Sequence, residues 1–178
     1  AGAIDTSPTG AAGSWTLRNS ALTVSMNDVI YANGRHFAVG TNGAIATFFE
    51  DGTTTLQNPA VVGVTNNLRR MAYGNGLYVV VGDGGRILTS PDAVTWTNRT
   101  LGSANYTALA FGGGKFVAAG AAGTYAVSND GIFWTPGSGT IGSANVLGMD
   151  YGLGMFVAVN ASGGIYTSTN GSTWNVQT

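Results

Sequence analysis

The sequence predicts an all-β fold made of repeated antiparallel units of four short strands, and two sets of evenly spaced residues support it. The first set is an aromatic residue after a glycine turn, spaced 41, 38 and 40 residues apart at Phe37, Tyr78, Phe116 and Phe156. The second set marks the last strand of each unit and is spaced 40, 38 and 40 residues apart, at Leu56, Trp96, Trp134 and Trp174. Two independent markers with one period indicate a structural repeat.

The stretch 73–100 is the clearest copy of the unit. Its apolar and β-branched runs predict strands at 77–81, 86–90 and 95–98. Glycines from Gly82 to Gly85 form the first reversal, and Pro91-Asp92 begins the second. The first strand of each unit is predicted at 28–31, 68–73, 106–111 and 146–151. No window has sustained helical periodicity, so we expect no helix longer than a turn or two.

Units of four strands at a period near 40 are typical of the blades of a β-propeller. A ring of blades covers the apolar faces of each sheet with its neighbours and leaves only short outer edges. An open β-solenoid is the rival architecture, but its repeats are usually shorter. We therefore predict one propeller domain of five blades, the first incomplete. The half-blade covers 1–24 and the complete blades about 25–64, 65–103, 104–143 and 144–178.

The half-blade is inferred from a partial copy of the unit at the amino end. Residues 2–8 match 85–91, and Trp15 takes the position of Trp96, so this copy holds only the third and fourth strands. The inner edge of its sheet is expected to be unpaired, and unpaired edges recruit strands. We expect residues before Ala1 in a longer parent, or another chain by strand addition, to fill the gap. The second option implies self-association.

Composition excludes several classes of protein. Charged residues make up 8% of the chain, and seven basic against eight acidic side chains give a net charge of −1. A nucleic-acid groove needs clustered Lys and Arg, so no nucleic-acid partner is expected. The chain has no cysteine, so it has no disulfides and no thiolate metal site. Its apolar runs have the length of strands, so no membrane insertion is expected. No cofactor is expected either. Because residue 1 is Ala, we expect a mature product or an excerpt of a longer protein.

The turn between the third and fourth strands resembles the Asp-box (BNR) repeat of sialidase-like propellers, whose pattern is Ser-x-Asp-x-Gly-x-Thr-Trp. The best copies run over 90–96, 128–134 and 168–174, each one residue shorter than the family pattern. The whole unit is similar to repeats in phage tail-associated and secreted bacterial propeller proteins. The resemblance implies a structural role for the turn acid or amide and for the tryptophan, namely for Asp92, Trp96, Asp130, Trp134, Asn170 and Trp174.

Catalysis is not expected, and no residue is assigned a catalytic role. A sialidase-type enzyme would need three arginines, a Tyr–Glu pair and an acid at the mouth of the channel. The only glutamate is Glu50, in a turn at the exterior of a blade. Arg69 and Arg70 are adjacent on one strand, so only one of them can face the channel. The turn acids lie on separate blades and cannot converge on one ion, so no metal site is expected.

Binding is the remaining class, and propellers offer loops and grooves between blades for it. The candidate ligand-binding residues are aromatic, amide or basic side chains near turns and inner strands: Arg69, Tyr106, Asn66, Asn105, Asn145, Arg35 and His36. The asparagines could instead cap turns, and Arg69 could pair with Asp150 or Asp28. The expected function is lectin-like recognition of a glycan or a cell-surface receptor by an extracellular or virion-associated propeller. The alternative is a structural or assembly domain, serving as decoration or scaffold, with no small ligand.

Overall fold

The computed structural model describes residues 4–7, 9–14, 16–18, 23–49, 54–57 and 64–177. Within them the chain forms five antiparallel sheets in which consecutive strands are neighbours. The first is a hairpin of β1 (Ile4–Thr6) and β2 (Thr16–Arg18), which pair with each other. The other sheets have four strands each, as predicted, and we name them blades 1 to 4 in chain order.

The strands of each blade run in order from its first to its fourth. Blade 1 contains β3 (Met26–Ala32), β4 (Arg35–Gly40), β5 (Ile45–Phe48) and β6 (Thr54–Gln57). Blade 2 contains β7 (Leu68–Gly74), β8 (Leu77–Gly82), β9 (Ile87–Ser90) and β10 (Thr97–Asn98). Blade 3 contains β11 (Tyr106–Gly112), β12 (Lys115–Gly120), β13 (Tyr125–Ser128) and β14 (Thr135–Pro136). Blade 4 contains β15 (Val146–Gly152), β16 (Met155–Asn160), β17 (Ile165–Ser168) and β18 (Asn175–Gln177). Two short 3-10 turns follow second strands, η1 (Thr41–Gly43) and η2 (Ala121–Gly123).

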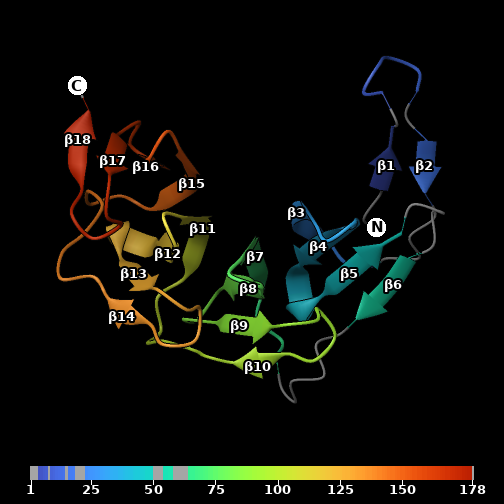
Figure 1. The fold of residues 1–178 in the computed structure, drawn as a ribbon, viewed down its shortest axis with the longest axis horizontal. Coiled ribbons are helices and arrows are strands. Elements are labelled where there is room, and N and C mark those ends of the chain that lie inside the picture. The colour runs from blue at the N-terminus through green and yellow to red at the C-terminus, as the bar shows by residue number, and fades with distance from the viewer. Residues whose placement is uncertain are drawn as a thin grey trace.

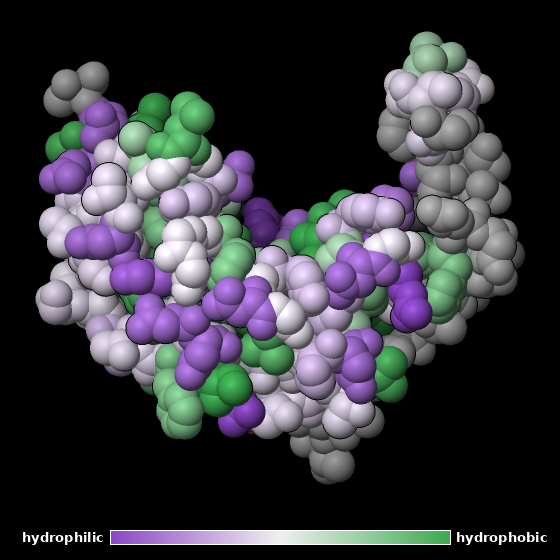
Figure 2. All heavy atoms as spheres, viewed as in Figure 1, coloured by the Kyte–Doolittle hydropathy of each residue, from purple (hydrophilic) through white to green (hydrophobic). Residues whose placement is uncertain are grey.

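The blades are arranged side by side along an arc, with their first strands on its inner side and their fourth strands on its outer side (Figure 1). The β1–β2 hairpin lies beyond blade 1, and the carboxyl end lies at the outer edge of blade 4. The space-filling view shows the arc hollowed between these two ends (Figure 2). The predicted propeller architecture is therefore confirmed, but the sheets do not close into a ring.

In every blade, a two-residue turn joins the first strand to the second. Both residues of the turn have positive φ, which is the pattern of a type I′ hairpin. In blades 1 and 2 the turn is Asn-Gly, with φ of 49° at Asn33 and 49° at Asn75. Blade 3 uses Gly113-Gly114, whereas blade 4 places Leu153 at φ 51°. The twist of such turns matches that of the flanking strands, which explains the regular register of these hairpins.

The register corrects one part of the repeat alignment. Tyr78 pairs with Tyr73, Phe116 with Phe111 and Phe156 with Tyr151, whereas in blade 1 it is His36 that pairs with Tyr31. The rings in these pairs stack, with centroids 4.8 Å apart for Tyr31 and His36 and 4.6 Å for Tyr73 and Tyr78. His36, and not Phe37, is therefore the equivalent of Tyr78. The sequence alignment was wrong by one residue because it matched the aromatic Phe37 instead.

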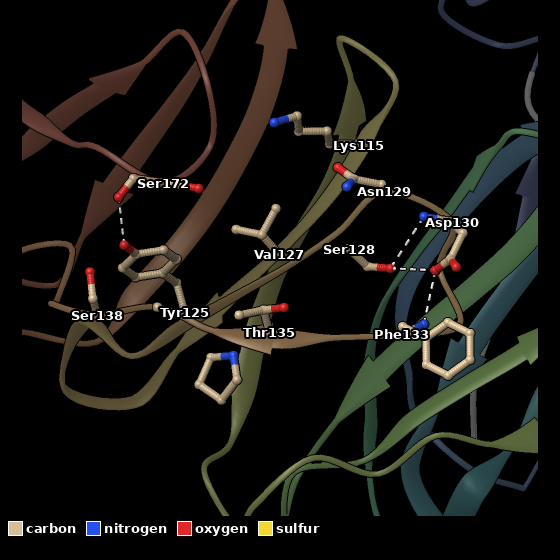
Figure 3. A pocket seen from close by; sticks show the side chains of 12 residues that line it. Lys115, Tyr125, Val127, Ser128, Asn129, Asp130, Phe133, Thr135, Ser138 and Ser172 are labelled. Atoms are coloured by element: carbon tan, nitrogen blue, oxygen red, sulfur yellow. Dashed lines mark hydrogen bonds between the residues drawn. The ribbon is translucent and has the colours of Figure 1, made fainter.

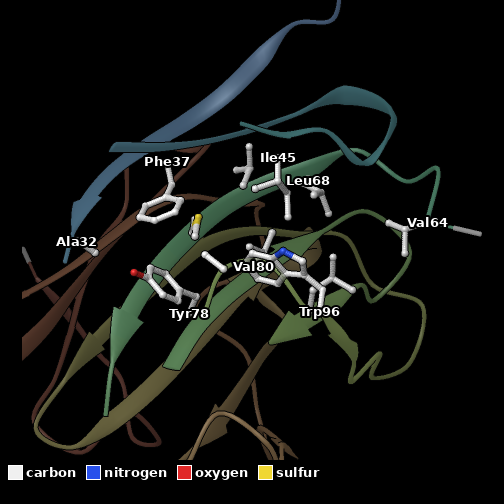
Figure 4. Close-up of a cluster of buried hydrophobic side chains, with 12 residues drawn as sticks. Ala32, Phe37, Ile45, Val64, Leu68, Tyr78, Val80 and Trp96 are labelled. Atoms are coloured by element: carbon white, nitrogen blue, oxygen red, sulfur yellow. The ribbon is translucent and has the colours of Figure 1, made fainter. Parts of the chain in front are cut away.

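The hydrophobic core lies between neighbouring blades. We call the face of a blade that meets the next blade its leading face, and the face that meets the preceding blade its trailing face. Phe37, Val39 and Ile45 on the leading face of blade 1 pack with Leu68, Tyr78, Val80, Leu88 and Trp96 of blade 2 (Figure 4). Val79, Val81 and Ile87 on the leading face of blade 2 pack in the same way with Tyr106, Leu109 and Phe116. Burying one such side chain fully stabilises the fold by about 1.5–3 kcal/mol.

A glycine at the end of each of two first strands makes room for an aromatic ring of the next blade. A Cβ at Gly74 would overlap the ring of Phe111, and a Cβ at Gly112 would overlap the ring of Tyr151. We call this position the glycine seat. It lets neighbouring first strands approach closely on the inner side of the arc.

Candidate functional site

The turn between the third and fourth strands is held by one side chain in blades 2, 3 and 4. Oδ1 of Asp92 accepts hydrogen bonds from the backbone N–H groups of Val94 and Thr95, both at 2.8 Å. Ser90 Oγ donates to the same oxygen at 2.8 Å. In blade 3, Oδ1 of Asp130 accepts from the backbone N–H groups of residues 132 and 133. In blade 4, Oδ1 of Asn170 accepts from those of residues 172 and 173. These residues cap the turn, as expected.

Because Asp92 caps this turn as a carboxylate, the stability of the protein should depend on pH in the acid range. Hydrogen bonds from the Thr95 and Val94 amides, followed by that from Ser90, lower the pKa of Asp92 to about 2. A carboxyl with a lowered folded-state pKa stabilises the protein above its unfolded pKa, about 3.9. This contribution is lost as the pH falls from there through the folded pKa. We expect an NMR titration of the Asp92 carboxyl to give that low pKa.

A matched variant separates this effect from other acid effects. Asp92→Asn should keep the turn, because Asn170 caps the equivalent turn through its amide oxygen. It should also weaken the loss of stability between about pH 4 and pH 2. An Asp92 carboxyl that titrates near its ordinary pKa would contradict the capping role.

The three tryptophans of these turns lie at the junctions between blades, but their burial differs. Trp96 is buried, whereas Trp134 and Trp174 are half-buried. Trp134 donates from Nε1 to the Gly131 carbonyl at 2.8 Å and packs beside Phe116. Trp174 packs edge-on to Tyr125, with ring centroids 6.3 Å apart. Their equivalence in position is as expected, and only Trp96 is buried as a core residue.

The candidate asparagines are used by the fold. Asn105 Oδ1 accepts from the Gly84 amide at 2.8 Å, and Asn145 Oδ1 accepts from the Ala122 amide at 2.9 Å. Both therefore cap a turn of the preceding blade. Asn66 Oδ1 accepts from Arg86 at 2.9 Å. The contacts of Asn105 and Asn145 fit the turn-cap interpretation, and the side-chain oxygens of all three asparagines are bonded within the protein.

The candidates on the first strands are also engaged. Arg69 forms a two-point ion pair with Asp83, with Nη2 to Oδ2 at 2.8 Å and Nε to Oδ1 at 2.9 Å, so its partner is neither Asp150 nor Asp28. The hydrogen bond from Arg69 lowers the pKa of Asp83. Tyr106 is buried in the core between blades 2 and 3, and this burial raises its pKa. Tyr106 was wrongly predicted to contact ligand, because it faces the neighbouring blade instead of the solvent.

Arg35 and His36 lie together at the hairpin between β3 and β4, whereas Arg69 lies at the opposite end of the equivalent strand pair of blade 2. Arg35 stacks over the Phe49 ring, with its Cζ atom 5.3 Å from the ring centroid. His36 is exposed and stacks on Tyr31. The predicted residues therefore do not converge on one site.

A groove of about 500 Å³ lies instead on the outer part of blade 3, beside the third turn of blade 4 (Figure 3). Its floor and walls come mostly from β13, β14 and the turn between them. The lining residues are Lys115, Tyr125, Val127, Ser128, Asn129, Asp130, Phe133, Thr135, Pro136, Gly137, Ser138 and Ser172.

The groove combines one exposed aromatic ring with hydrogen-bonding groups of both kinds. The Phe133 side chain is 79% exposed at one end of the groove. Asp130 beside it accepts from the Phe133 and Ile132 amides, and these bonds lower its pKa, so the carboxylate is ionised at neutral pH. Tyr125 at the other end is fixed by donating from its hydroxyl to the Ser172 carbonyl at 2.6 Å. Hydroxyl and amide groups of Ser138, Thr135 and Asn129 also line the groove.

Sequence reasoning missed this groove, although it contains one visible signal. Phe133 occupies the turn position that Thr95 and Thr173 occupy in blades 2 and 4. An aromatic residue at an exposed position where the other copies have threonine is not explained by the repeat. The structural role that the resemblance implies for this turn concerns the capping residue and the tryptophan, and it leaves the other side chains of the turn unassigned.

Two classes of site are absent from the part of the chain that the structure describes. No group of three or more His, Asp or Glu side chains there is placed to share a metal ion. No helix within the same residues is long and apolar enough to cross a membrane.

Similar solved structures place the fold among the β-propellers. The virginiamycin B lyase of Staphylococcus aureus aligns with a TM-score of 0.79 and 13% identity over 99% of this chain and 63% of the lyase chain. The structure described as YCF48 bound to D1 peptide aligns with a TM-score of 0.67 and 19% identity over 92% of this chain and 56% of that one. The chain therefore spans less than two thirds of these proteins.

A third similar structure is of comparable length. The computationally designed Ika4 protein aligns with a TM-score of 0.62 and 14% identity over 83% of this chain and 92% of its own. At these identities the likeness concerns the fold alone. No protein-family model matches the sequence, and no curated protein does.

Proposed function

We propose that this chain is a non-catalytic module that binds a carbohydrate in the groove on the outer part of blade 3. The observation that supports this most is Phe133, an aromatic ring 79% exposed at the end of a polar groove. Aromatic rings are enriched at binding surfaces, where they offer a large apolar face. The proposal includes an extracellular or virion-associated propeller related to Asp-box proteins.

The chemistry of the groove suits an uncharged sugar. The apolar face of a pyranose ring, which carries C–H groups, can pack on the ring of Phe133. Sugar hydroxyls both donate and accept, and the groove offers an ionised acceptor in Asp130 and a cationic donor in Lys115. A charge-assisted hydrogen bond to a carboxylate is about twice as strong as a neutral one, so Asp130 would fix the sugar's orientation.

The same set of residues supports binding without hydrolysis. Asp130 is the one carboxylate among the lining residues, whereas glycoside hydrolysis generally uses two carboxyl groups about 5–9.5 Å apart. Its oxygen already accepts two backbone amides, which disfavours its use as a proton donor.

The test is a glycan array followed by calorimetry with the best-bound sugar. Phe133→Ala should weaken binding about tenfold or more, as truncation of a central aromatic does in other binding sites. The matched control is Thr173→Ala, at the same turn position on blade 4, and it should bind like the parent chain. The proposal fails if no glycan binds, or if both variants bind as tightly as the parent.

A receptor peptide is the second ligand class, since the similar YCF48 structure is described as bound to a peptide. A peptide array run with the same two variants distinguishes it. Loss of peptide binding in Phe133→Ala, with no glycan bound, would assign the groove to a protein receptor. A structural or assembly role is the remaining alternative, and it concerns a different surface.

A further inference from the structure

The leading face of blade 4 is apolar and uncovered. Val159 is 42% exposed and Ile165 46%, whereas their equivalents on blade 2, Val81 and Ile87, are fully buried by blade 3. Hydrophobic side chains are visible at this end of the arc (Figure 2). Blade 4 therefore has, on its leading face, the apolar side chains of a blade that another blade covers.

The glycine seat of blade 4 is empty. Nothing lies within 4 Å of the position that a Cβ would take at Gly152, whereas Gly74 and Gly112 each lie against an aromatic ring of the next blade. The turn after the second strand of blade 4 also lacks the contact that its equivalents have. Gly163 meets nothing within 4 Å, whereas its equivalents lie against the backbone that leads into the next blade.

At the other end of the arc, two side chains on the trailing face of blade 1 are exposed where their equivalents in later blades are covered. Tyr31 is the equivalent of Phe111 and Tyr151, but its ring is 61% exposed, and no glycine among the described residues lies against it. Val29 on the same trailing face is also exposed, although its equivalent Met71 is buried. One end of the molecule therefore has an empty seat, and the other end has the ring that such a seat accepts.

The residues that differ from the repeat at the two ends are chemically complementary. In the core between blades 3 and 4, Ala110 packs in one cluster with Phe156. By the strand registers, the equivalent of Ala110 on blade 4 is Asp150, and the equivalent of Phe156 on blade 1 is His36. Both are exposed. An imidazole can donate a hydrogen bond to a carboxylate, so docking these faces would pair the two.

From these matches we propose that a second copy of this chain docks head-to-tail, with the leading face of blade 4 against the trailing face of blade 1 of its neighbour. Tyr31 of one copy then lies over Gly152 of the other, and His36 meets Asp150. The contact repeats the one between consecutive blades, so a second copy continues the curve of the arc, and the proposal is a closed ring of two copies (Figure 1).

Docking in this position would displace the β1–β2 hairpin. Blade 4 of the neighbour takes the sector of the ring beyond blade 1, where β1 and β2 now lie (Figure 1). The hairpin must therefore move aside when the ring closes. Contacts between neighbouring blades are concentrated on their first strands, such as β7 with β11 and β11 with β15. On the trailing face of blade 1 the first strand is open, with Val29 and Tyr31 exposed. In contrast, Ala38, Ala46 and Phe48 on the second and third strands are already buried within the chain and must be uncovered for the full contact.

Sedimentation velocity of the 178-residue chain over a range of concentrations tests the proposal. The parent chain should form a closed dimer, and Gly152→Val or Tyr31→Ala should weaken the association about tenfold or more. Gly139→Val is the control, because Gly139 also meets nothing within 4 Å but lies outside both faces, and it should associate like the parent. The variants should keep the circular dichroism of the parent.

The charge pair gives a second, independent readout. His36→Asp places like charges together and should weaken association about tenfold. Adding Asp150→Ala should restore much of it, because alanine is the residue that blade 3 has at this position. A parent chain that is monomeric at all concentrations would overturn the proposal, as would a dimer unaffected by Gly152→Val, Tyr31→Ala and His36→Asp.

Discussion

Gly112→Val is expected to destabilise the protein by about 3 kcal/mol, at the upper end of what overfilling a packed core costs. A Cβ at this position would overlap the ring of Tyr151 at its attachment end, where the ring cannot swing away. Either the ring leaves the core between blades 3 and 4, or the two first strands separate. Chemical denaturation followed by tryptophan fluorescence measures the loss.

Gly152→Val is the matched control, because it makes the same change at the equivalent position of blade 4. Measured in dilute protein, it should change the free energy of unfolding by no more than about 0.5 kcal/mol, as is usual for an exposed site. Equal losses for the two variants would show that the valine itself, and not the ring over Gly112, is responsible.

Phe116→Ala is expected to cost about 3–5 kcal/mol, the range for a buried aromatic residue. Its side chain is fully buried, stacked on Phe111 at 4.6 Å and beside Trp134 at 6.4 Å between ring centroids. The collapse of neighbours into the space would be limited, because blades 2 and 3 are held apart by their own hydrogen-bonded strands. Thermal unfolding should show the loss as a lower melting temperature.

His36→Ala changes the equivalent position on blade 1 and should have almost no effect in dilute protein, within about 0.5 kcal/mol. The two residues share a register position but not a covering blade. A small loss for Phe116→Ala, or a large one for His36→Ala, would mean that the core does not lie between blades as described.

The sequence predicted the architecture well because period and turn chemistry are local properties. The first strands expected at 68–73, 106–111 and 146–151 match β7, β11 and β15 to within a residue. The slip at Phe37 has a clear reason. The turns after β4 and β8 both have four residues, so β4 and β8 align without a gap and place His36 opposite Tyr78. The position is exposed in blade 1 and has a histidine where the buried positions have an aromatic residue, so the alignment shifted to the next aromatic residue, Phe37. The expected turn at 51–53 and the side chains of Trp15 and Leu56 lie outside the described residues.

The site was predicted less well, because exposure and partner choice are not local. Asn105 and Asn145 looked available, but each reaches the turn of the preceding blade, which is distant in sequence. Tyr106 is polar enough to suggest a surface, yet the next sheet covers it. Conversely, no prediction was made for Phe133, whose ring is exposed. Such assignments depend on which strand faces which, and only the assembled arc determines that.

Each interface joins two blades that follow each other in the sequence, and this order allows the chain to fold during synthesis. Hydrogen bonds that join neighbouring blades span about one repeat, 41 residues from Asn27 to Leu68 and 43 from Met71 to Asp28. A blade leaving the ribosome therefore finds its predecessor already available as a template, and needs nothing made much later. Structure can then spread blade by blade from the first complete sheet. Force applied to the two ends should reverse that order, peeling whole blades from an end of the arc in separate steps.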